Sequence, residues 1–100
     1  MKRQIFNQYV TLVADLFRVN EKHLFKKSKK KEYVDARYML YYLCATRPMR
    51  ITWIQMFMSE RGYDIAHSPI IYGVKIVSDR VENDKDYASI VKRFEMLCEV

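Results

Sequence analysis

Glycine and proline are scarce in this chain, with two residues of each among 100. A fold of many β-hairpins needs turn residues of these types, so their scarcity argues against an all-β structure. The sequence also lacks any apolar run close to the roughly 20 residues that cross a bilayer. No apolar signal-peptide core follows the basic first residues. We therefore expect a soluble, cytoplasmic protein that is complete from Met1 and has no membrane partner.

Cysteine is also rare, and both cysteines, Cys44 and Cys98, lie in apolar helical patterns. Because no secretion signal is present, we interpret them as reduced core side chains rather than as a disulfide. Neither they nor His23 and His67 have the short spacing of zinc ligands. The chain also lacks a nucleophile–base signature and a Gly-x-x-x-x-Gly-Lys-Ser/Thr motif. We therefore expect no enzymatic activity, no metal and no cofactor.

Hydrophobic residues make up 50% of the chain and aromatic residues 14%, which is enough for the core of one domain. The net charge of +6 is concentrated in a single segment, residues 26–31. Such a local basic patch is typical of an anion-binding site, although a solvated charge run or a nuclear-localisation-type stretch has the same composition. The five lysines of this segment are Lys26, Lys27, Lys29, Lys30 and Lys31.

The spacing of apolar residues predicts five or six helices, and therefore a small all-α bundle. Thr52 and Gln55 fit a capping box, and Gly62 fits the left-handed residue that closes the same helix. Ser68 and Pro69 fit the N-cap and first helical position of the next helix. The expected helices are 3–18, 21–25 after the cap Asn20, 32–46 before Pro48, 52–61, 68–80, and 84–98 after the cap Asn83 or Asp84.

Aromatic residues are frequent in the helix expected over 32–46. We interpret them as core residues, because they share the helix with other apolar side chains. Stacking on nucleobases, as in single-strand binders, is the alternative. Trp53 is also expected in the core. The residues concerned are Tyr33, Tyr38, Tyr41 and Tyr42, and the expected inner face of the last helix is Tyr87, Ile90, Val91, Phe94, Leu97 and Cys98.

Two of the expected helices flank a short segment around Gly62–His67, which makes them a candidate helix–turn–helix. In that motif the N-terminal part of the second helix enters the DNA major groove. His67, Ser68, Tyr72 and Lys75 lie near that end of the helix or on its polar side. Lysines of the basic segment would neutralise phosphates, which gives affinity without sequence information.

Three parts of the chain resemble the C-terminal DNA-binding domain of the bacterial replication initiator DnaA, a Trp-repressor-like helix–turn–helix fold. They cover roughly residues 10–80 of a single domain over 1–100, and the helix expected at 84–98 is additional. The resembling segments are Val13–Phe17 with Asn20–Leu24, Lys26–Lys31 with Ala36–Met39, and His67–Lys75.

This resemblance implies double-stranded DNA as the partner. It implies that the basic loop reaches the minor groove and that the second helix of the motif reads the major groove. Ile51 would lie near the DNA backbone beside Thr52. The implied contacts are Lys29 and Lys31 in the loop, Arg37 and Thr52 at the backbone, and His67 and Ser68 at base edges or phosphates.

The chain also departs from the family pattern. Ala66 replaces a base-reading aspartate, and Pro69 replaces a threonine. The loop has only lysines, which cannot make the bidentate guanine contact of arginine. We therefore expect non-specific or differently specific DNA binding, in a replication or transcription accessory factor of a mobile element or phage.

A non-catalytic protein-interaction or structural adaptor that retains the fold is the alternative function. The same two departures favour it, as does the acidic composition of residues 79–100, with six acids against four bases. A homodimer, or a protein partner bound through the C-terminal helix, is compatible with both functions.

Overall fold

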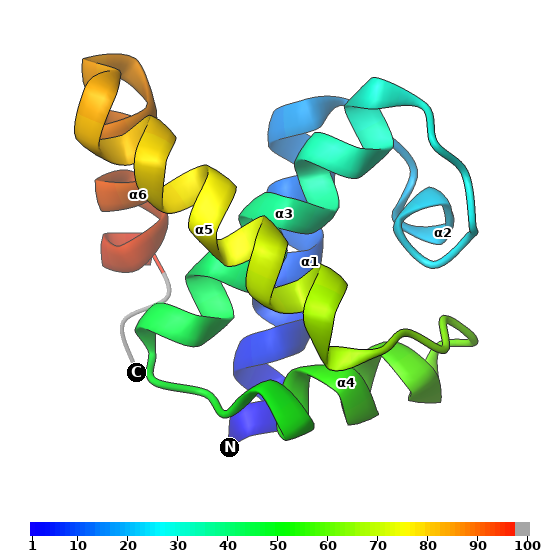
Figure 1. The fold of residues 1–100 in the computed structure, drawn as a ribbon. Helices are drawn as coiled ribbons and strands as arrows, with labels where there is room; N and C mark the ends of the chain where they lie inside the picture. The colour runs from blue at the N-terminus through cyan, green and yellow to red at the C-terminus, as the bar shows by residue number, and fades with distance from the viewer. Residues whose placement is uncertain (98–100) are drawn as a thin grey trace.

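The chain is helical along most of its length in the computed structural model, which describes residues 1–97 (Figure 1). No strand occurs within that range, so the predicted all-α bundle is confirmed. The helices are α1 (Lys2–Phe17), α2 (Glu21–Leu24), α3 (Lys31–Thr46), α4 (Ile51–Glu60), α5 (His67–Asn83) and α6 (Lys85–Leu97).

Helices α3 and α5 cross at the centre of the molecule, and α3 also packs along α1 (Figure 1). Helix α6 folds back beside the C-terminal part of α5, whereas α2 lies on the opposite side of the bundle. Because α3 contacts all the other helices, its apolar surface extends over several sides. The largest fully buried side chains are Phe6, Tyr9, Leu24, Met39, Leu40, Tyr41, Leu43, Ile54, Met58 and Ile70.

Helix α1 confirms the predicted apolar stripe, since Phe6, Val10 and Val13 are buried. It ends where Arg18 adopts a left-handed conformation with φ of 54°. The Val19 N–H then donates to the Ala14 carbonyl at 3.0 Å, the Schellman arrangement that satisfies carbonyls at a helix C-terminus. Glycine usually occupies this left-handed position, because it has no Cβ.

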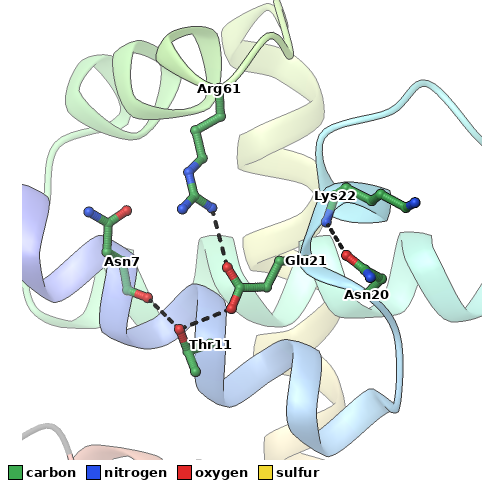
Figure 2. A network of polar contacts seen from close by, with 6 residues as sticks. All are labelled: Asn7, Thr11, Asn20, Glu21, Lys22 and Arg61. Atoms are coloured by element: carbon green, nitrogen blue, oxygen red, sulfur yellow. Dashed lines mark hydrogen bonds and ion pairs between the residues drawn. The ribbon is translucent and has the colours of Figure 1, made fainter.

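Helix α2 has only four residues and depends on neighbours for its position. The predicted cap is confirmed, because the Asn20 side chain accepts from the Lys22 N–H at 3.1 Å. The Glu21 carboxylate lies 3.2 Å from the Thr11 hydroxyl of α1 and 3.7 Å from the Arg61 guanidinium at the end of α4 (Figure 2). These contacts attach α2 to two other elements of the bundle.

The predicted capping box at the start of α4 is wrong. The helix begins at Ile51 after the N-cap Arg50, and no side chain caps it. The Gln55 amide instead contacts the segment after the helix, so a tertiary partner replaced the local one. The predicted end is confirmed: Gly62 has φ of 90°, and its N–H donates to the Ser59 carbonyl at 2.9 Å.

Helix α5 begins earlier than predicted. His67 is its first residue and Ala66 its N-cap, so Ser68 is not the cap and Pro69 is the third helical residue. Proline is tolerated there because the N–H groups of the first turn have no intrahelical acceptor. The helix also continues to Asn83 rather than to about residue 80. The predicted cap of α6 is confirmed at Asp84, whose carboxylate accepts from the Asp86 N–H at 2.9 Å.

Several predicted core positions are wrong, and Ile71, expected on the buried face of the helix over 68–80, is 55% exposed. Trp53 is 39% exposed, because Ile54, Phe57 and Met58 form the inner face of α4. Leu97, at the end of α6, is 67% exposed, whereas Val91 and Phe94 are buried as predicted. Of the tyrosines of α3, Tyr41 is buried and Tyr33, Tyr38 and Tyr42 are half-buried; Cys44 is buried, and Cys98 lies outside the described residues.

Helices α3 and α5 approach closely at Gly73, where α5 has no side chain. A Cβ at this position would lie 2.6 Å from Cδ1 of Tyr38 and 3.0 Å from Cδ2 of Tyr41. The absence of a side chain therefore allows two tyrosine rings of α3 to pack directly on the α5 backbone.

We expect Gly73→Ala to lower the stability of the fold. Overpacking a core contact costs about 1–3 kcal/mol, and the better helix propensity of alanine offsets roughly 1 kcal/mol of that loss. Urea denaturation should therefore give a net loss of about 1 kcal/mol in the free energy of unfolding. The exposed Lys75→Ala in the same helix is the control and should change it by less than about 0.5 kcal/mol. A raised midpoint for Gly73→Ala would contradict the close packing.

Candidate nucleic-acid interface

The five lysines lie where α2 passes into α3, and all are exposed. Lys30 is the N-cap of α3 and Lys31 its first residue, so the loop proper is short. Of these five lysines, only Lys30 forms an ion pair within residues 1–97, and its ammonium lies 3.7 Å from the Glu32 carboxylate. The other lysine ammonium groups are therefore available to an external anion.

The backbone of this lysine loop is nevertheless ordered. The Ser28 N–H donates to the Lys26 carbonyl at 2.8 Å, and the Ser28 hydroxyl accepts from the Lys30 N–H at 3.3 Å. The rings of His23 and Tyr33 stack with centroids 4.6 Å apart and join the two helices that the loop connects. The conformation thus depends on backbone bonds and ring packing, so the lysine side chains are not needed to hold it.

Arg37 is not the surface phosphate contact that the sequence predicted. It is 5% exposed, and it donates from Nε to the Leu24 carbonyl at 2.9 Å. Its Nη2 donates to the carbonyls of Lys26 at 2.5 Å and His23 at 3.3 Å. The last carbonyls of a helix have no intrahelical donor, and a buried cation there satisfies them. Arg37 therefore holds the start of the lysine loop.

The same guanidinium contacts the segment that follows α4. Its Cζ lies 5.1 Å from the centroid of the Tyr63 ring, within the range of a cation–π contact. The Tyr63 N–H donates to the Met58 carbonyl at 3.0 Å, so the residue is also fixed to the end of α4. Arg37 thus joins the lysine loop to the connection between α4 and α5.

Polar side chains hold the α4–α5 connection. The Gln55 amide donates to the Ile65 carbonyl at 2.8 Å, and its oxygen lies 2.8 Å from Nε2 of His67. The Ser59 hydroxyl donates to the Asp64 carboxylate at 2.7 Å. These bonds set the position of the first turn of α5 relative to α4.

Helix α5 presents a mixed face to solvent. His67 and Ser68 are exposed in its first turn, and Lys75 is exposed two turns further along. Between them lie Ile71 and Tyr72, each 55% exposed. The Tyr72 ring packs edge-on against Tyr38 with centroids 6.0 Å apart, which limits its motion. The face combines hydrogen-bonding, cationic and apolar groups.

The lysine loop and the beginning of α5 line opposite parts of one cleft of about 400 Å³, which we call the central cleft. Lys27, Ser28 and Lys29 contribute from the loop, and Ala66 and Pro69 contribute from the start of α5. The remaining lining residues are Val34, Arg37, Tyr38, Tyr41, Tyr63, Asp64 and Ile65. Burial raises the pKa of the Tyr41 hydroxyl above its usual range.

The predicted site residues therefore divide into groups. Lys27 and Lys29 lie at the central cleft, close to the start of α5. Thr52 lines a second cleft of about 400 Å³, with Gln55 and Met56, and does not belong to the first. The residues that lie on α5 or the loop outside the lining of the central cleft are Lys26, Lys30, Lys31, His67, Ser68, Tyr72 and Lys75.

Sequence reasoning missed the role of Arg37, although a signal was present. Arg37 shares one helical face with the buried residues Leu40, Tyr41 and Cys44, at spacings of three, four and seven. A cationic side chain on such a face is expected to be buried and hydrogen-bonded, and not to contact a partner at the surface. By contrast, no local pattern connects Gln55 with Ile65 or Tyr63 with Arg37.

Within residues 1–97, no three His, Cys, Asp or Glu side chains are grouped as metal ligands would be. None of the helices in this range is long and apolar enough to cross a bilayer.

We expect Arg37→Met to destabilise the protein by about 3 kcal/mol, because it leaves the Leu24 and His23 carbonyls without this donor and removes one of the two donors of the Lys26 carbonyl. Arg37→Lys should recover only part of this loss, since one ammonium cannot reach all three acceptors. Urea denaturation measures the change, and hydrogen exchange at residues 24–30 reports the loop. The exposed Arg50→Met is the control. Equal stability of the Arg37→Met and Arg50→Met variants would show that the guanidinium does not hold the loop.

Comparisons with known proteins give no relative for this chain. No protein-family model matches it, and neither curated proteins nor solved structures give a significant match. Function is therefore inferred from the loop, the central cleft and the face of α5.

Proposed function

We propose that this protein binds double-stranded DNA, with the lysine loop at the phosphates and the first turns of α5 in the major groove. The observation that carries the proposal is the shared cleft, because Lys27 and Lys29 lie beside the start of α5. Two regions that sequence reasoning linked to DNA for separate reasons are thus neighbours.

The charge distribution supports phosphate binding at the loop. Four of its five lysines have no ion pair within residues 1–97, and their backbone is held by contacts that do not use the ammonium groups. A protein that brings ordered lysines to a duplex releases counterions and gains affinity. The lysines give orientation on the duplex but no base recognition.

The exposed groups of α5 support a role in the major groove. His67, Ser68 and Lys75 supply polar contacts, and Ile71 and Tyr72 offer apolar surface of the kind that contacts thymine methyl groups. Helix α4, held to α5 through Gln55, would be the first helix of a helix–turn–helix. The resemblance to the DnaA C-terminal domain agrees with this proposal.

We expect the double variant Lys29→Ala, Lys31→Ala to bind a mixed-sequence duplex more weakly and with less dependence on salt. Fluorescence anisotropy at several salt concentrations should give a log–log slope equivalent to about three to six released counterions for the natural sequence. The double variant should lose about two of them.

The matched control is Lys85→Ala with Lys92→Ala, which removes the same charge from α6 on the far side of the bundle (Figure 1). This control should keep the slope of the natural sequence. Absence of duplex binding at low salt by folded protein would refute the proposal. An equal loss of duplex affinity in both double variants would show that the lysine loop is not part of the proposed DNA-binding surface.

A protein-interaction adaptor remains the second candidate, favoured by the exposed apolar side chains of α5 and α6. Ile71 and Tyr72 are each 55% exposed, and Met96 and Leu97 are 70% and 67% exposed. An adaptor would keep its partner after the loss of Lys29 and Lys31, whereas a DNA-binding protein would not keep its duplex.

A further inference from the structure

The central cleft combines aromatic walls with cations at one side. Tyr38, Tyr41 and Tyr63 line it together with the apolar side chains of Val34 and Ile65. Lys27 and Lys29 line its loop side. A duplex on the outer face of the loop and of α5 needs the lysines but does not use the tyrosines of the cleft, of which Tyr41 is buried and the other two are half-buried.

The aromatic residues of the cleft are held in place before any ligand arrives. The rings of Tyr38 and Tyr41 lie against the α5 backbone at Gly73, where a Cβ would be 2.6 Å and 3.0 Å away. Tyr63 is fixed by its N–H bond to Met58 and by the guanidinium of Arg37. Binding in such a pre-formed cleft costs little ordering of side chains.

One polar group in the lining of the cleft has unused hydrogen-bonding capacity. Tyr41 is 1% exposed, and its hydroxyl has no hydrogen-bond partner within residues 1–97. Buried polar groups are almost always hydrogen-bonded, so an unpartnered one beside a cleft indicates a ligand with polar atoms.

We propose that the central cleft binds a single nucleotide unit, with its base among the tyrosines and its phosphate at Lys27 and Lys29. The volume of about 400 Å³ suits a small ligand. Bases stack on aromatic side chains whatever their identity, and lysines bind phosphate as point charges. This function does not depend on duplex binding by the outer surface.

The position of Asp64 orients the nucleotide. Asp64 lines the cleft on the side of the α4–α5 connection, and its carboxylate accepts from the Ser59 hydroxyl at 2.7 Å. A phosphate near it would be repelled, so the anionic end of the ligand lies toward the lysines. A base in a duplex is stacked and paired, so only a free nucleotide or an unpaired nucleotide of a strand can enter the cleft.

The test is a titration of the ¹⁵N-labelled full chain, followed by NMR, with deoxythymidine 5′-monophosphate and with deoxyribose 5-phosphate. The nucleotide should give saturable shifts at residues 27–29 and 63–66, with about tenfold higher affinity than the sugar phosphate, since only the nucleotide can stack. Equal affinity of the two compounds would overturn the proposal. So would the lack of saturable shifts at millimolar nucleotide.

Matched variants locate the site. Ala66→Phe should fill the cleft and weaken nucleotide binding by about tenfold, whereas Met56→Phe on exposed α4 surface should not. Lys27→Gln with Lys29→Gln should weaken it by about fivefold. Lys26→Gln with Lys31→Gln, outside the lining, removes the same charge and should have less than about a twofold effect. Equal losses in the two lysine pairs would refute a defined phosphate position.

A second titration identifies the source of the nucleotide and separates this proposal from duplex binding. A short single strand is compared with the same strand carrying abasic positions. Tighter binding of the strand than of the mononucleotide, lost with abasic positions, assigns an unpaired strand; equal binding assigns a free nucleotide. Failure of every nucleotide ligand with intact duplex binding removes only the cleft proposal. Nucleotide binding without duplex binding removes only the function proposed for the outer surface.

Discussion

The functional surface depends on the hydrogen bonds and the cation–π contact of the Arg37 guanidinium. It is buried, it donates to carbonyls at the end of α2 and in the lysine loop, and it faces the ring of Tyr63. One planar group with five N–H donors in fixed directions can do this, whereas an ammonium cannot. This one side chain contacts the lysine loop and the α4–α5 connection, and it also lines the cleft between them.

The repulsion between five lysine charges opposes holding them in one short, ordered segment. Besides Arg37, the groups that hold the loop are the Ser28 hydroxyl, the backbone carbonyl of Lys26 and the stacked rings of His23 and Tyr33. Few lysines of the loop pair with a carboxylate, so the positive charge of the loop is not neutralised. An anion that arrives therefore meets a charged surface whose backbone is already in place, and the entropy lost on binding is reduced.

Much of the fold could be predicted from the sequence, because helix periodicity is local information. The stripe of α1, the cap Asn20 and the left-handed Gly62 are examples, each determined within a few residues. Two of the predictions that failed involve partners distant in the chain. Gln55 bonds across ten residues to Ile65, and Arg37 reaches 13 residues back to Leu24. The lysine loop could be recognised from composition, but the tyrosine-lined cleft beside it requires the packing of α3 against α5.

The contact between Gln55 and His67 has a consequence for the chemistry of the first turn of α5. The Gln55 amide nitrogen is directed to the Ile65 carbonyl, so its oxygen faces Nε2 of the imidazole. An oxygen can only accept, and Nε2 must therefore carry the proton. In the neutral ring this tautomer leaves Nδ1 as an acceptor. A hydrogen-bond donor that approaches the exposed ring can therefore use the Nδ1 lone pair, whereas Nε2 is already occupied by Gln55.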